Sequence, residues 1–258
     1  MKNHLWLIYE LTKREISQRY RGTILGVMWP IFYSILFLSI FSFVFSFMLK
    51  VRWGADSNQS SMMHATLMIF CGMVPYMFVA EVMGRSPSFM LSAQNLVKKV
   101  RFPVHLIPLV NVNAAMIMTL INAALLLIFA FIAGDAGPAA ILYVALLMLP
   151  LYLFALGVGW IFASVAVFFR DLVQLGPIIA QILMFMAPIF YPASAVPADF
   201  QAIFLLNPLT YFVEAIRAAL TGQFAIMGWV AATGFHAAFA VFGRFVFARL
   251  RPAFGDLL

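Results

Sequence analysis

The stretch VHLIPLVNVNAAMIMTLINAALLLIFAFIA, residues 104–133, decides the fold class of this chain. It contains no aspartate, glutamate, lysine or arginine, and it lies in a longer window without charge that extends from Arg101 to Asp135. A helix needs about 20 apolar residues to cross the hydrocarbon core of a bilayer. The sequence therefore predicts a membrane-spanning helix over 104–133.

Five further windows of the same kind make the whole chain a polytopic membrane protein. Of the 258 residues, 65% are hydrophobic and only 10% are charged, whereas a soluble domain carries roughly 25% charged residues. The uninterrupted apolar runs are unlike the short alternating strands of a membrane β-barrel. We therefore predict an all-α fold. The six predicted spans are 24–49, 62–82, 104–133, 139–168, 172–191 and 224–247.

The distribution of lysine and arginine predicts the orientation. With both termini on one side, 13 of the 16 basic residues fall on that side, and only Lys50, Arg52 and Arg217 fall on the other. Cytoplasmic loops carry the excess of positive charge, so both termini are expected in the cytoplasm. The basic residues are scattered over separate segments, which argues against nucleic-acid binding.

Three segments outside the spans carry features of their own. Residues 3–21 alternate apolar and charged positions at helical spacing, which predicts an amphipathic helix at the membrane interface, either a plain anchor or one that also contacts a partner. The segment 84–103 is expected in the cytoplasm and contains the basic run QNLVKKV, 94–100. It is either a positively charged loop or a short helix exposed to the cytoplasm.

The third segment, 193–222, is too apolar for a solvated loop and too broken by proline for a span. Asn207 and Pro208 predict a helix start with a side-chain cap. Glu214 and Arg217 are three residues apart on that helix and can pair. We predict two short helices that dip into the outer leaflet, with an external hairpin as the alternative.

Several kinds of chemistry are not supported by any motif. The sequence has no phosphate-binding G-x-x-x-x-G-K-[ST] pattern, no G-x-S-x-G elbow and no His/Cys/Asp/Glu set with metal spacing. Ion-coupled transport relies on carboxylates or histidines inside the membrane, and the predicted spans are nearly empty of them. If the protein moves a substrate, the energy must come from a separate subunit.

Polar and aromatic side chains within the spans are candidates for a transport path. Polar groups are costly in lipid, so they are expected to face other helices, either as packing contacts or along an aqueous path. Aromatic rings can face lipid or stack on the apolar side of a sugar. The candidate lining residues are Trp29, Tyr33, Phe37, Ser42, Asn122 and Gln181.

Local patterns spread over nearly the whole chain resemble one known family. The patterns are RYRGTILG (19–26) with Trp29-Pro30, Phe102-Pro103, Phe169-Arg170-Asp171, APIFYP (187–192), and LNPL (206–209) with Arg217. In their order and spacing they are similar to the permease subunits of ABC-2 type exporters, in the branch that exports O-antigen, capsule and teichoic acid.

The resemblance implies two copies of this chain and two ATP-binding subunits in the inner membrane of a bacterium. ATP and magnesium would bind in the partner subunit, so no cofactor is expected in this chain. The residues that resemble the coupling helix for that partner are Gln94, Asn95, Lys98, Lys99 and Arg101. Arg170 and Asp171 match the short cytoplasmic turn of the family, and the pair of helices at 193–222 matches its external gate, with Asn207, Glu214 and Arg217.

The mechanism expected from this resemblance is export of a polyprenyl-pyrophosphate-linked glycan. Its anionic head would be attracted to Arg14, Arg19 and Arg21, and the glycan would pass between the two copies. An ABC-2 permease for a drug or lipid is the first alternative. A membrane-embedded glycan-modifying enzyme would need a polar catalytic cluster, which the sequence lacks, and an ion-coupled transporter is disfavoured by the spans.

Overall fold

The computed structural model describes residues 2–19, 21–48, 53, 62–93 and 103–257. Within these ranges the chain forms helices joined by turns, and no strand is present. The elements in chain order are α1 (Lys2–Arg19), η1 (Gly26–Met28), α2 (Trp29–Ser42), η2 (Phe43–Met48), α3 (Met62–Ser92), α5 (Leu106–Ala133), α6 (Ala140–Phe168), α7 (Leu172–Phe185), η3 (Ala193–Ala195), η4 (Ala198–Phe200), α8 (Gln201–Leu206), α9 (Pro208–Leu220), α10 (Ile226–Leu250), η5 (Arg251–Ala253) and α11 (Phe254–Leu257). The predicted all-α class is confirmed.

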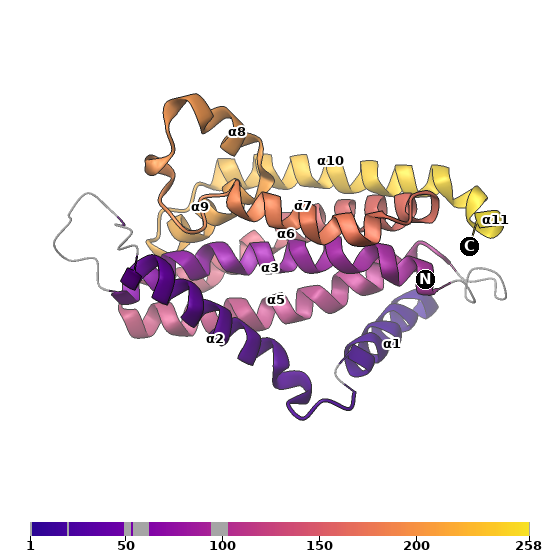
Figure 1. Ribbon diagram of the computed structural model, residues 1–258, viewed down its shortest axis with the longest axis horizontal. Coiled ribbons are helices and arrows are strands. Elements are labelled where there is room, and N and C mark those ends of the chain that lie inside the picture. The colour runs from indigo at the N-terminus through magenta and orange to yellow at the C-terminus, as the bar shows by residue number, and fades with distance from the viewer. Residues whose placement is uncertain (1, 20, 49–52, 54–61, 94–102, 258) are drawn as a thin grey trace.

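The long helices α3, α5, α6 and α10 lie along the longest axis of the molecule (Figure 1). Both termini lie at one end of this bundle, which we call the terminal end, and the opposite end is the far end. Helices α2, α5 and α7 run toward the far end, and α3, α6 and α10 run back. Helix α3 is central, because it packs against α2, α5, α6, α7 and α9.

Four described helices are long and apolar enough to cross a membrane: Met63–Ser92, Leu106–Ala133, Ala140–Phe168 and Ile226–Ala253. The pair Ala198–Leu206 and Pro208–Leu220 is bent by 95° and passes the same test only when taken together. Two shorter apolar helices cover Trp29–Phe45 and Leu172–Phe185. The chain is therefore a multi-pass helical membrane protein.

Small residues allow the helices to approach closely. A Cβ added to Gly243 of α10 would lie 2.5 Å from the carbonyl oxygen of Gly157 on α6. A Cβ added to Gly176 of α7 would lie 2.4 Å from the carbonyl oxygen of Met83 on α3. Lipid tails are as apolar as the helix surfaces, so close van der Waals packing at small residues is what holds such helices together.

Several helix boundaries differ from the predicted spans. Helix α3 does not stop at residue 82 but continues to Ser92, through the first part of the segment 84–103, for which both a charged loop and a short helix were open. The charged residues Glu81 and Arg85, at the end of the predicted span, pair with α1, and Met90 is fully buried. Burial and ion pairing thus extend the helix beyond the apolar window.

The ends of the first, fifth and sixth predicted spans also shift. The helix of the first predicted span, α2, begins at Trp29 instead of residue 24, after a turn and the short η1. Pro30 fits the first turn of this helix. The fifth ends at Phe185 instead of 191, and the chain turns there ahead of Pro188. Helix α10 covers Ile226–Leu250, close to the predicted 224–247.

Candidate functional site

A cavity of about 450 Å³ opens where α1 and α2 face α3 and α5. The first turns of α2 lie away from the other long helices, and the turn after α1 connects α1 to them (Figure 1). The cavity is lined by Arg19, Thr23, Trp29, Pro30, Tyr33, Ser34, Tyr76, Met77, Ala80, Glu81, Arg85, Met118 and Asn122. It therefore has an aromatic side, a polar interior and a charged rim.

The polar interior is built by one residue from each of three helices. The Ser34 hydroxyl of α2 donates to the amide oxygen of Asn122 on α5, over 2.8 Å. The Ser34 hydroxyl and the Asn122 amide nitrogen also contact the sulfur of Met77 on α3, at 3.8 and 4.0 Å. Ser34 and Asn122 are buried, so this contact fixes α2 against the central helices.

The aromatic side belongs mainly to α2. Trp29 stacks on Phe32 at 5.5 Å between ring centroids, and Tyr33 contacts Phe37 at 4.9 Å. Trp29 and Tyr33 are both exposed. Of the predicted lining residues, Trp29, Tyr33 and Asn122 share this cavity, and Phe37 packs directly beside it.

Of the remaining two predicted lining residues, Gln181 does not line this cavity. Ser42 ends α2, and its side chain is outside the described part of the structure. Gln181 lies exposed on α7, which packs on another side of α3. Sequence alone missed the contributions of Ser34, Tyr76 and Met77, although a serine within an apolar helix is itself a signal for a buried contact.

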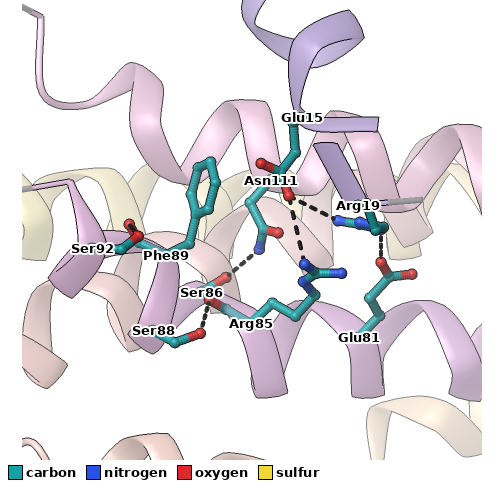
Figure 2. A network of polar contacts seen from close by, with 9 residues as sticks. All are labelled: Glu15, Arg19, Glu81, Arg85, Ser86, Ser88, Phe89, Ser92 and Asn111. Atoms are coloured by element: carbon teal, nitrogen blue, oxygen red, sulfur yellow. Dashed lines mark hydrogen bonds and ion pairs between the residues drawn. The ribbon is translucent and has the colours of Figure 1, made fainter. Parts of the chain in front are cut away.

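The charged rim joins α1 to α3 through four side chains, which Figure 2 shows. Arg19 donates through Nη1 to Glu81 Oε1. Its Nη2 lies 3.6 Å from Glu15 Oε1, and Arg85 Nη2 lies 3.7 Å from the same oxygen. The Arg19 and Glu15 side chains are only 5% and 11% exposed, so their charges are balanced within the protein.

A second polar contact lies next to this rim. The amide nitrogen of Asn111 on α5 donates to the hydroxyl of Ser86 on α3, over 3.1 Å (Figure 2). Both side chains are buried. Helices α3 and α5 are thus bonded to each other one residue beyond Arg85.

The other two predicted headgroup arginines remain exposed. Arg14 lines a smaller cavity of about 310 Å³ between α1 and the facing ends of α3 and α5. Arg21 lies in the turn after α1. The three arginines therefore occupy different environments, because only Arg19 is buried among carboxylates.

The far end contains a buried arginine. The Arg217 guanidinium of α9 donates to the Met68 carbonyl oxygen at 3.0 and 3.3 Å and to the Ile189 carbonyl oxygen at 3.1 Å. It also donates to Glu214 over 2.7 Å, the pairing that the spacing predicts. Its Cζ lies 4.6 Å from the ring centre of Trp53. One side chain thus connects α9, α3 and the turn after α7.

Asn207 shapes the elbow between α8 and α9. Its side-chain oxygen accepts from the backbone N–H of Leu209 over 3.0 Å, and Pro208 occupies the first turn of α9. Its amide nitrogen donates to the Leu183 carbonyl oxygen over 2.8 Å, which anchors the elbow to α7. The helix start predicted from Asn207-Pro208 is confirmed.

Two predicted sites remain, the cytoplasmic turn and the segment expected to contact the ATP-binding subunit. Arg170 and Asp171 form the exposed turn between α6 and α7. Gln94, Asn95, Lys98, Lys99 and Arg101 lie outside the described residues. In the part of the chain that the structure describes, no three His, Cys, Asp or Glu side chains gather in a way that could hold a metal ion.

These features define a class: a helical multi-pass membrane protein with a lined cavity beside its spans. Residues 7–221 match the family model described as ABC-2 type transporter, and the chain belongs to that family. It is 25% identical to the O-antigen export system permease protein RfbA of Klebsiella pneumoniae, over 100% of this chain and 98% of the relative. It is also 25% identical to the polysialic acid transport protein KpsM of Escherichia coli, over 80% of this chain and 78% of that protein.

Proposed function

We propose that this chain is the membrane permease subunit of an ATP-driven exporter of lipid-linked polysaccharide, of the O-antigen or capsule kind. The observation that carries this proposal is the end-to-end match to an O-antigen export permease, which leaves only 2% of that relative uncovered. A similar match over four fifths of the chain to a polysialic acid transporter supports the same class of cargo. The chain itself is a transport subunit, and ATP is hydrolysed in a separate subunit.

The cavity at α2 suits a carbohydrate. Aromatic faces such as those of Trp29 and Tyr33 pack against the apolar side of a sugar ring. The Asn122 amide nitrogen, which lines the cavity and takes no part in the bond to Ser34, is a donor for a sugar hydroxyl. The exposed arginines Arg14 and Arg21 are cationic groups of the kind that attracts a pyrophosphate. Arg19 belongs to the same expected set, but it is already paired with two carboxylates.

Six crossings fit the course of the helices. Helices α2 and α7 are short, but each runs toward the far end and is followed by a return helix (Figure 1). Counting them with the four long helices places both termini on one side, which the basic residues assign to the cytoplasm. Helix α1 then lies at the cytoplasmic interface, and α8 and α9, bent by 95°, form the re-entrant gate on the outside.

A homodimer with two ATP-binding subunits completes the transporter. A homodimer is expected because one six-helix bundle has little room for a sugar-wide channel, and apolar side chains of α2 and α7 such as Phe32, Ile178 and Phe185 remain exposed. The basic segment 94–101 follows the end of α3 and is the expected contact for the ATP-binding partner.

Deletion of the gene tests the cargo. Loss of surface polysaccharide, with its lipid-linked precursor accumulating inside the cell and export returning on complementation, is the expected result. An unchanged surface polysaccharide together with a defect in drug or lipid export would assign the chain to another ABC-2 cargo. Co-purification with an ATP-binding subunit from the host tests the partner.

Charge reversal tests the coupling segment. Changing Lys98 and Lys99 to glutamate is expected to abolish both transport and the stimulation of ATP hydrolysis. The change Arg249→Glu, at an exposed position in the last turn of α10, is the matched control for charge alone. If transport and stimulation both persist in the Lys98/Lys99 variant, the coupling role is wrong.

A further inference from the structure

Two pairs of opposite charges face each other between α1 and α3. Glu15 and Arg19 are four residues apart on α1, and Glu81 and Arg85 are four residues apart on α3. Arg19 contacts Glu81 and Glu15 contacts Arg85, while Arg19 and Glu15 also contact each other within α1. The four residues, which we call the charge lock, sum to zero formal charge.

The order of the charges specifies one register. Helix α1 runs opposite to α3 (Figure 1), so residue numbers increase on one helix as they decrease on the other. A shift of one helical turn would place Arg19 against Arg85, or Glu15 against Glu81. Like charges at such positions repel, so only the observed register balances all four groups. The burial of Glu15 and Arg19 strengthens this selection, because water screens buried charges poorly.

The charge lock is the main polar connection between the two helices. The apolar face of α1 packs chiefly on α5, and its long charged side chains reach across to α3. The bond between Asn111 and Ser86 joins α5 to α3 beside the lock. Helices α1, α3 and α5 are therefore connected pairwise at the terminal end.

We propose that the charge lock makes α1 and α3 one moving unit, so that a displacement of α3 is transmitted to the mouth of the cavity. Arg19, Glu81 and Arg85 line that cavity as well as forming the lock. Segment 94–101, the proposed contact for the ATP-binding subunit, connects α3 to α5 in the chain, so a force on it acts on the ends of these two helices. This inference rests on the proposed function for its physiological meaning, although the lock itself is independent of the cargo.

The inference also divides the expected headgroup arginines into two roles. Arg19 is a positioning residue, since its guanidinium is held by two carboxylates and its side chain is 5% exposed. Contact with an anionic head then falls to the exposed Arg14 and Arg21. A charge change at Arg19 is expected to affect coupling, and one at Arg14 or Arg21 the apparent affinity for cargo.

The test uses the permease assembled with its ATP-binding subunit in liposomes. Arg19→Glu and Glu81→Arg each place like charges together. Each is expected to reduce cargo-stimulated ATP hydrolysis and transport, roughly 5–150-fold, the range of a usual coupling free energy. Basal hydrolysis and the KM for ATP should stay near the wild-type values. The double variant Arg19→Glu/Glu81→Arg restores opposite charges between α1 and α3, although Glu15 and the new Glu at position 19 then repel within α1, and it should recover part of the stimulation.

Lys13→Glu, an exposed charge reversal on the same helix, is the control and should behave like the wild type. If a single variant fails to assemble, recovery of assembly and stimulation in the double variant still supports the lock, and failure to recover contradicts it. Full stimulation in both single variants would also overturn it.

A second measurement separates the lock from the cargo. With Cys71 replaced by alanine, cysteines introduced by Leu11→Cys and Ser92→Cys, at two positions that line the same small cavity between α1 and α3, report the spacing of the two helices by cross-linking. Equal cross-linking rates in the ATP-bound and nucleotide-free complexes are expected, whereas a nucleotide-dependent change would contradict movement as one unit. If these rates are equal but the wild type exports no polysaccharide, the lock stands and the proposed function fails.

Discussion

The contact between α6 and α10 gives the most direct test of the packing. A Cβ on Gly243 would lie 2.5 Å from the oxygen and 2.8 Å from the Cα of Gly157. Gly234 is on the same helix, and a Cβ there would meet no atom within 4 Å. The variants Gly243→Ala and Gly234→Ala therefore make the same chemical change in a crowded and in an open position.

The magnitude follows from these distances. Carbon atoms pack at about 3.5–4.0 Å, so Gly243→Ala forces the two helices apart by on the order of 1 Å. Overpacking of this kind costs about 1–3 kcal/mol. Replacing glycine by alanine within a helix stabilises it by about 1 kcal/mol, and this gain is common to both variants. Gly243→Ala is therefore expected to be about 1–3 kcal/mol less stable than Gly234→Ala.

Reversible unfolding in mixed detergent and dodecyl sulfate micelles, followed by tryptophan fluorescence, measures that difference. The wild type is the common reference for both variants. If the two alanine variants differ by less than about 0.5 kcal/mol, the usual scatter of surface substitutions, the close approach of Gly157 and Gly243 is refuted.

Three further predictions concern buried polar groups. Arg217→Met should lower the free energy of unfolding by about 3–5 kcal/mol in the same assay, because it leaves backbone carbonyls and a carboxylate without their donor. Arg249→Met is the exposed control, and an equal effect of the two variants would contradict the buried role of Arg217. Asn207→Ala removes a helix cap and should cost about 1–2 kcal/mol, seen as faster hydrogen exchange at the start of α9 and absent if the elbow is held by packing alone. Ser34→Ala leaves the Asn122 amide oxygen without that donor and should cost about 1–3 kcal/mol, while adding Asn122→Leu should recover part of the loss.

The sequence predicted the helical class and much of the helix placement. The windows without charge between Arg101 and Asp135, and between Asp135 and Arg170, contain α5 and α6 almost to the residue. Apolar length alone sets these limits, because lipid excludes charge. Asn207-Pro208 predicted a capped helix start for a local reason, as the cap depends on neighbouring atoms only.

Features that depend on distant contacts were not predictable in the same way. Helix α3 extends to Ser92 because Glu81 and Arg85 find partners on α1, which lies more than sixty residues earlier in the chain. The spacing of four between opposite charges is visible in the sequence at both places, but the pairing of the two helices is not. The crowding at Gly243 likewise depends on where α6 passes.

The placement of the charges bears on the source of energy for transport. Ion-driven transport needs an acidic or imidazole group within the membrane that can exchange its proton or ion during the cycle. Among the described side chains, the carboxylates Glu15, Glu81 and Glu214 each neutralise a guanidinium that is itself largely buried. Removing such a carboxylate leaves an uncompensated buried charge, so these groups are suited to holding helices in place rather than to cycling. These ion-paired carboxylates agree with the membership of the chain in the ABC-2 type transporter family, which implies an ATP-binding partner as the source of energy.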